Sequence, residues 1–116
     1  MTMKDALGHG SDSAGGGVPT AAHQSMVRKV LASGDLMGAL AHAVTGYDRR
    51  QQAMAESRGS YYNHYALGHY LGATERIHED VQKGKSLPDA INAHTNGPLA
   101  NAIHKALGTG VKAPRY

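Results

Sequence analysis

The sequence contains no phenylalanine, no tryptophan and no cysteine among its 116 residues. The absence of cysteine excludes disulfide bonds and thiolate metal sites, and it fits a reducing compartment. No apolar run approaches the roughly 18 residues that a membrane-spanning helix needs, and no charged-then-apolar leader precedes the chain. We therefore expect a protein that is neither exported by a signal peptide nor inserted in a membrane.

Acidic residues are the scarcer charged class, with nine Asp and Glu against twelve Lys and Arg, which gives a net charge of +3. This mildly basic balance is compatible with a nucleic-acid partner but does not identify one. The length predicts a single domain. Because alanine supplies much of the apolar content, the core must depend on a small number of Leu, Ile, Val, Met and Tyr side chains.

The first 17 residues differ from the remainder of the chain. They include five glycines and no apolar periodicity, and such a segment cannot offset its ordering entropy by itself. We expect residues 1–17 to form a flexible, extended Gly/Ser-rich arm, residues 18–108 a single helical domain, and residues 109–116 a short basic tail.

Helical spacing of apolar residues and helix-end signals predict an all-α chain with no strand. The expected helices cover about residues 20–33, 35–57, 60–83, 86–95 and 98–107. Ser60 and Ser86 are expected as N-caps, and Gly34, Gly84 and Gly108 as stops. The second and third helices should form a long antiparallel hairpin within a small bundle of four to five helices. Its expected core includes Leu36, Leu40, Val44, Tyr47, Met54, Leu67, Leu71, Ile77 and Val81.

Aromatic residues are concentrated between Tyr61 and Tyr70, which hold four of the six tyrosines. At about 100° per residue, one arc of the expected third helix faces the core through Leu67, Tyr70, Leu71, Thr74, Ile77, His78 and Val81. The opposite arc carries Tyr62, Tyr65, His69 and Arg76, with Tyr61 at its edge. Such a second face either packs under another helix of the same chain or binds a partner, because Tyr and Arg are favoured at interfaces. Stacking of nucleic-acid bases on these rings is a further alternative.

No pattern in the sequence indicates catalysis or metal binding. No two histidines lie three or four residues apart on an expected helix, and the Glu75–His78 spacing of a carboxylate metal site occurs once where two copies are needed. The chain has no nucleophile elbow and no phosphate-binding loop, and Ser57, Ser60 and Ser86 are explained as helix-end residues. We expect no enzymatic activity, no cofactor and no metal.

Residues 89–107 fit a helix-turn-helix in part. Ala93, Gly97 and Ile103 occupy the positions of the small residue, the turn glycine and the buried aliphatic, whereas Pro98 replaces the usual aliphatic after the turn. The candidate nucleic-acid-binding residues are Asn101, His104, Lys105, Lys112 and Arg115. The alternative is a plain helical corner that packs on the hairpin.

A weaker pattern extends over about residues 60–108. Its parts are Tyr65-Ala66-Leu67-Gly68 with Leu71-Gly72, Gly84, Asp89-Ala90-Ile91, His94, Asn96-Gly97 and the run from Leu99 to Lys105. This pattern resembles small uncharacterised proteins encoded by tailed bacteriophages and prophages. The resemblance implies a context and transfers no site residues.

The resemblance implies a non-enzymatic bacteriophage protein that acts through protein–protein contacts, as a virion structural or assembly accessory component. Its partners would be virion proteins, a host protein or further copies of itself, and its location the virion or the host bacterial cytoplasm. The alternatives are a small helix-turn-helix-like DNA-binding regulator and an inhibitor of a host defence or host enzyme.

Overall fold

The computed structural model describes residues 18–113, so the expected arm of residues 1–17 and Arg115 lie outside the described residues. The described part folds into five helices and contains no strand, which confirms the all-α prediction. The helices are α3 (Ala21–Ala32), α4 (Leu36–Arg58), α5 (Ala66–Gln82), α6 (Leu87–His94) and α7 (Gly97–Leu107).

Most helix ends lie where the capping signals predict them. The Asp35 carboxylate accepts the backbone N–H of Gly38 at 2.8 Å and caps α4. The Ser86 hydroxyl accepts the N–H of Asp89 at 3.3 Å and caps α6. Gly59 ends α4 with a φ of 64°, in the left-handed region that glycine adopts without a steric penalty.

The expected start of the third helix at Ser60 is wrong, because α5 begins six residues later, at Ala66. The Ser60 hydroxyl instead donates to the Ala55 carbonyl at 3.3 Å. Asn63 Oδ1 accepts the N–H of Tyr65 at 3.0 Å, and the Asn63 carbonyl accepts the N–H of Ala66 at 3.1 Å. These bonds form a local turn that competes with the helical pattern, and they delay the helix.

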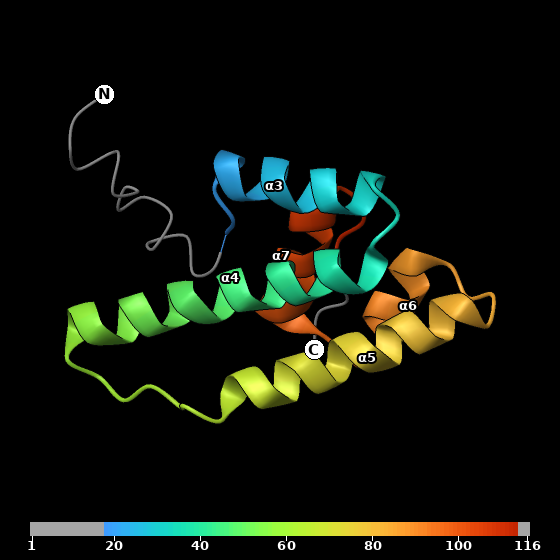
Figure 1. Ribbon diagram of the computed structural model, residues 1–116. Coiled ribbons are helices and arrows are strands. Elements are labelled where there is room, and N and C mark those ends of the chain that lie inside the picture. Colours follow the sequence, from blue (N-terminus) through green and yellow to red (C-terminus); the bar gives the residue numbers. More distant parts are fainter. Residues whose placement is uncertain (1–17, 114–116) are drawn as a thin grey trace.

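The two longest helices, α4 and α5, lie side by side and run in opposite directions (Figure 1). In the same view α3 lies above the first half of α4, and α6 lies beside the second half of α5. The last helix, α7, contacts α3, α4 and α6. The tyrosine-rich segment therefore lies at one end of the α4–α5 pair, remote from α6.

The core takes side chains from all five helices. The largest fully buried ones are Val27, Leu40, Val44, Thr74, Ile77, Ile91 and Ile103. Of the expected core residues, Leu40, Val44, Tyr47 and Ile77 are buried, and Leu36, Leu67, Leu71 and Val81 are half-buried against the same core. Met54 is half-buried and lines a surface groove at the end of α4.

Helix α7 is an inner helix rich in alanine. Its buried residues are Ala100, Ala102, Ile103, His104, Ala106 and Leu107. Small side chains allow the backbones of neighbouring helices to approach closely. Arg28 of α3 holds the end of α7, since its guanidinium donates to the carbonyls of Lys105 at 2.8 Å and Ala106 at 3.3 Å. A cation at this end also complements the helix dipole.

Candidate functional site at the tyrosine loop

The connection between α4 and α5, residues 59–65, is called the tyrosine loop below. Its backbone is fixed at Gly59 by the end of α4 and at Asn63 by the turn that precedes α5. Because the loop is not helical, Tyr61 and Tyr62 do not share a helical face with His69 and Arg76 as the sequence predicted. Tyr65 occupies the N-cap position of α5.

Tyr62 is half-buried beside Asp48 of α4. Its hydroxyl interacts with the Asp48 carboxylate, and its ring meets the ring of His64 edge-on with centroids 5.0 Å apart. Burial of the ring, followed by the bond to Asp48 and its negative charge, raises the pKa of Tyr62 to about 12. Tyr62 is therefore held by the same chain and serves the structure of the loop.

A second aromatic contact continues this inner layer. Tyr47 of α4 and Tyr70 of α5 meet edge-on with ring centroids 5.6 Å apart, an arrangement that stabilises beyond area burial alone. Asp48 lies among these rings at 6% exposure, and its Oδ1 atom has no hydrogen-bond partner among the described residues. Burial, and then the Asp48 charge, raise the pKa of Tyr70.

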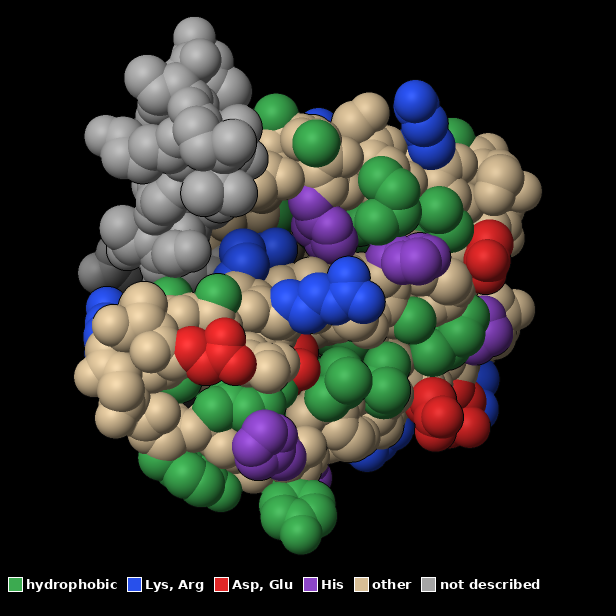
Figure 2. All heavy atoms as spheres, turned by 60° about the vertical axis from the view of Figure 1, so that its left-hand side comes forward, with side chains coloured by type: hydrophobic (Ala, Val, Ile, Leu, Met, Phe, Trp, Pro, Cys, Tyr) green, Lys and Arg blue, Asp and Glu red, His purple; other side chains and the backbone are tan. Residues whose placement is uncertain are grey.

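Tyr61 and Tyr65 point outward. They are 81% and 79% exposed, the highest values of the large apolar side chains in residues 18–113. Figure 2 shows apolar side chains projecting from the lower edge of the face that it presents. A ring this exposed contributes little to the fold, so the two outward tyrosines are available for contact with another molecule.

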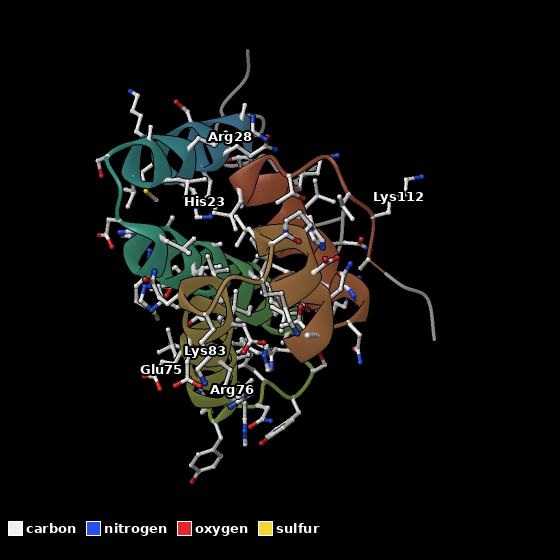
Figure 3. The ribbon with its side chains drawn as sticks, turned by 90° about the vertical axis from the view of Figure 1, so that its right-hand side faces the viewer. His23, Arg28, Glu75, Arg76, Lys83 and Lys112 are labelled. Carbon is white, nitrogen blue, oxygen red and sulfur yellow. The ribbon has the colours of Figure 1, made fainter. Side chains whose placement is uncertain are left out.

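His69 and Arg76 are also exposed on α5, and Figure 3 places Arg76 at the surface of that helix. Of the five residues expected at a partner surface, Tyr61, Tyr65, His69 and Arg76 are therefore exposed, and Tyr62 is half-buried. No helix of the described chain covers these four side chains. The outward tyrosines lie in and beside the loop, and the two α5 residues extend the surface away from it.

A groove of about 250 Å³ lies between the tyrosine loop and the two helix ends. Its lining residues come from α4, from the loop and from the start of α5: Gln51, Met54, Ala55, Arg58, Ser60, Tyr61, Tyr62, Asn63, Ala66 and Tyr70. Rings, a thioether, amides and one guanidinium are the groups that protein-binding surfaces use, because they combine apolar area with hydrogen-bonding tips.

The expected DNA-binding residues are not presented together. His104 is only 2% exposed, and its Nε2 lies 2.8 Å from Asn92 Oδ1 while its Nδ1 lies 2.6 Å from Thr109 Oγ1. Burial lowers the pKa of His104. The prediction that this side chain faces outward is wrong. Both ring nitrogens lie in the interior, where they contact Asn92 of α6 and Thr109 in the segment after α7.

The other members of that set remain at the surface with different surroundings. Asn101 Oδ1 accepts the N–H of Ala113 at 2.8 Å, which fixes the segment after α7. Lys105 and Lys112 are exposed, and Lys112 projects away from the helices (Figure 3). Gly97 has the positive φ, 58°, of a turn glycine, but Ala93 is exposed where a helix-turn-helix buries its small residue.

Two further histidines make local contacts. His94 Nε2 lies 2.7 Å from Asp80 Oδ2, which ties α6 to α5 and lowers the pKa of Asp80, and His78 lies 3.3 Å from Gln82. Among residues 18–113 no three His, Asp or Glu side chains gather closely enough to hold a metal ion. None of the described helices has both the length and the apolar character needed to cross a membrane.

No family model, no curated protein and no solved structure matches this chain. Sequence reasoning missed the Tyr62–Asp48 interaction and the buried histidine of α7. The first joins a helix to a loop that was expected to be helical. The second had a usable signal, because His104 lies between Ile103 and Ala106 on the apolar side of an alanine-rich helix.

Proposed function

We propose that this chain is a non-enzymatic protein that binds another protein through the tyrosine loop and the groove beside it. The observation that carries the proposal is the contrast within the loop: Tyr62 is half-buried beside Asp48, whereas Tyr61 and Tyr65 are about four-fifths exposed. A rigidly held loop presents its rings at low entropic cost, because the backbone is already ordered before binding.

The context that we propose is a bacteriophage or prophage, with the protein as a virion structural or assembly accessory component. The resemblance of residues 60–108 to small phage proteins supports this context. An inhibitor of a host defence or host enzyme would use the same chemistry with a different partner. Self-association through the outward tyrosines is a form of the same proposal, with a second copy as the partner.

The test is the double replacement Tyr61→Ala and Tyr65→Ala in the full chain. Interface tyrosines often contribute about 2 kcal/mol each, which corresponds to roughly 30-fold in affinity. We expect the variant to keep its helical spectrum and its thermal midpoint and to lose its partner. Pull-downs from lysates of infected and uninfected bacteria, with sedimentation velocity of the purified chain, would measure this loss.

The matched control replaces two other exposed apolar residues, Met26 and Val111, with Ala. The control should retain the partner. If the tyrosine variant captures the same protein as the wild type, or self-associates as strongly, the tyrosine loop is not the binding surface. A lowered thermal midpoint would instead mean that the outward tyrosines stabilise the fold.

The helix-turn-helix alternative has less support after the fold is considered. Helix α7 contacts three other helices, so its exposed strip is narrow and includes Asn101 and Lys105 but not His104. A DNA-binding protein should retard duplexes at low salt and lose affinity steeply as salt rises. Absence of any retardation at low salt would remove this alternative.

A further inference from the structure

Helix α5 has one face that no other helix of residues 18–113 covers. Its contacts within this part of the chain are with α4 and α6, and it lies at the outer edge of the molecule (Figure 1). From the N-cap residue to the C-cap residue, the uncovered stripe advances alternately by four and by three residues. This stripe is called the α5 seam below, and it consists of Tyr65, His69, Gly72, Arg76, Glu79 and Lys83.

The spacing of the α5 seam is that of helices that pack side by side. Alternating steps of four and three residues keep one line of side chains facing a second helix along its whole length. Five of the six seam residues are exposed, and Gly72 is half-buried. The seam is therefore a contact line without a second helix in the monomer.

The side chains of the seam are not occupied inside the protein. Within residues 18–113 the side chains of Tyr65, His69 and Arg76 make no hydrogen bond and no ion pair. Lys83 Nζ lies 3.4 Å from Glu79 Oε1, but the two side chains are 71% and 67% exposed, and such a pair contributes little to stability. Figure 3 shows Arg76 and Lys83 on α5. These groups are available to a partner.

The seam is complementary to itself when two copies of α5 run in opposite directions. We consider a two-fold axis at the level midway between residues 72 and 76. Each seam residue then faces a different seam residue of the second copy, and every pairing occurs twice. The facing pairs are Tyr65 with Lys83, His69 with Glu79, and Gly72 with Arg76.

Each facing pair joins groups that attract or fit one another. The ammonium group of Lys83 can lie over the ring of Tyr65, a cation–π contact. An imidazole N–H of His69 can donate to the carboxylate of Glu79. Gly72 leaves room for the Arg76 side chain, because a Cβ built on Gly72 meets only a nitrogen of its own Arg76, at 3.5 Å.

We propose that a second copy of this chain binds to the α5 seam and forms an antiparallel, two-fold symmetric dimer. A parallel dimer would place identical residues opposite one another. Arg76 would then face Arg76, Glu79 would face Glu79 and Lys83 would face Lys83, and these like charges would repel. The charges of the seam thus select the antiparallel arrangement.

The proposed dimer deepens the proposed function and rests on it, since Tyr65 belongs to both surfaces. The antiparallel arrangement places the tyrosine loop of each copy beside the connection between α5 and α6 of the other. Helix α5 has 17 residues, a length of about 25 Å. A contact along one helix of this length is small, so we expect a weak dimer whose population depends on protein concentration.

Disulfide cross-linking tests the pairing directly, because the chain has no cysteine of its own. The full-length variants His69→Cys and Glu79→Cys are mixed and oxidised mildly. The antiparallel dimer should give a heterodimer joined between the two positions, since a disulfide needs Cα atoms within about 7 Å. A mixture of Lys105→Cys and Lys112→Cys, both exposed residues outside α5, is the control. Equal yields in the two mixtures, or preferential joining of His69→Cys to itself, would overturn the inference.

Sedimentation equilibrium of the full chain measures the strength of association. His69→Glu alone and Glu79→Lys alone each place like charges opposite one another, twice in every dimer, and should weaken association by roughly tenfold. The double variant His69→Glu, Glu79→Lys restores opposite charges and should recover the wild-type affinity. Lys105→Glu, an exposed charge reversal on α7, is the control and should have no effect. A double variant that associates no more tightly than the single variants would overturn the inference.

Failure of this inference can be distinguished from failure of the proposed function. Tyr61 lies outside the seam, so Tyr61→Ala should weaken capture of another protein by the tyrosine loop and leave the dimer unchanged. A wild-type chain that remains monomeric up to about 1 mM but captures another protein would overturn the seam dimer and leave the proposed function intact. A chain that cross-links through the seam but captures no other protein would support the dimer alone.

Discussion

Replacing Tyr62 with Phe removes one hydroxyl group and keeps the ring that meets His64. That hydroxyl interacts with Asp48, a carboxylate that is 6% exposed and whose Oδ1 has no hydrogen-bond partner among the described residues. The variant changes side-chain volume very little, so its main effect is to remove this polar interaction from a buried charge. The loss should appear as a lower free energy of unfolding.

The size of the effect follows from the type of bond. A hydrogen bond to a charged group contributes about 1.5–3 kcal/mol to stability. Tyr62 is half-buried, so water can replace part of the lost bond, and we expect about 1.5 kcal/mol. For a domain of this size each kcal/mol shifts the thermal midpoint by about 4–8 °C. The midpoint of the variant should therefore fall by about 6–12 °C.

Thermal and urea unfolding followed by circular dichroism would measure the change. Tyr61→Phe is the matched control, because it removes a hydroxyl from a side chain that is 81% exposed and should alter stability by less than about 0.5 kcal/mol. Alkaline absorbance titration should also lose the tyrosine that ionises near pH 12 in the wild type. Equal midpoints for the two variants would refute the role assigned to the Tyr62 hydroxyl.

Three further predictions concern stability. Burial lowers the pKa of His104 below 6.5 in the folded protein. As the pH falls, His104 therefore binds a proton in the unfolded chain before it does so in the folded one, and the free energy of unfolding should decrease below about pH 6.5. Urea unfolding of His104→Gln should show a weaker pH dependence in this range. Gly46→Ala should lower the unfolding free energy by about 1–3 kcal/mol because the added Cβ overlaps His23. Gly68→Ala in α5 should raise it by about 0.5–1 kcal/mol, because a Cβ there meets nothing within 4 Å. Chemical denaturation of the two variants should therefore show changes of opposite sign. Ser86→Ala should cost about 1 kcal/mol through loss of the α6 cap, and an unchanged urea midpoint would show that the cap contributes nothing.

Helix ends were predictable wherever the signal is local in sequence. Asp35 and Ser86 cap their helices through an N–H three residues ahead, a contact that requires no knowledge of tertiary structure. Ser60 has the same chemistry, yet it failed as a cap because Asn63 captures the backbone N–H of Tyr65. Ser60 and Asn63 can both bond backbone N–H groups near the start of α5. The sequence alone does not show which of them does so.

The sequence indicated most of the exposed residues of the candidate site, but not how they are arranged in space. Tyr61, Tyr65, His69 and Arg76 are exposed, as a partner surface requires. They could be predicted because the concentration of tyrosines is visible in the sequence. The separation of Tyr62 from this surface depends on Asp48, fourteen residues earlier on α4, and a helical wheel that treats the segment in isolation cannot show that contact. The flexible arm expected for residues 1–17 and the DNA-binding role expected for Arg115 remain predictions.

The central position of α7 has a consequence for how the chain folds during synthesis. The three helices that α7 contacts leave the ribosome before it does, and until residues 97–107 follow, the sides of α3 and α4 that pack against α7 have no cover. Early segments of this chain can form helices but cannot complete their core, so we expect the cooperative step to come late. Fragments that end before Gly97 should consequently expose apolar surface, aggregate and be degraded quickly.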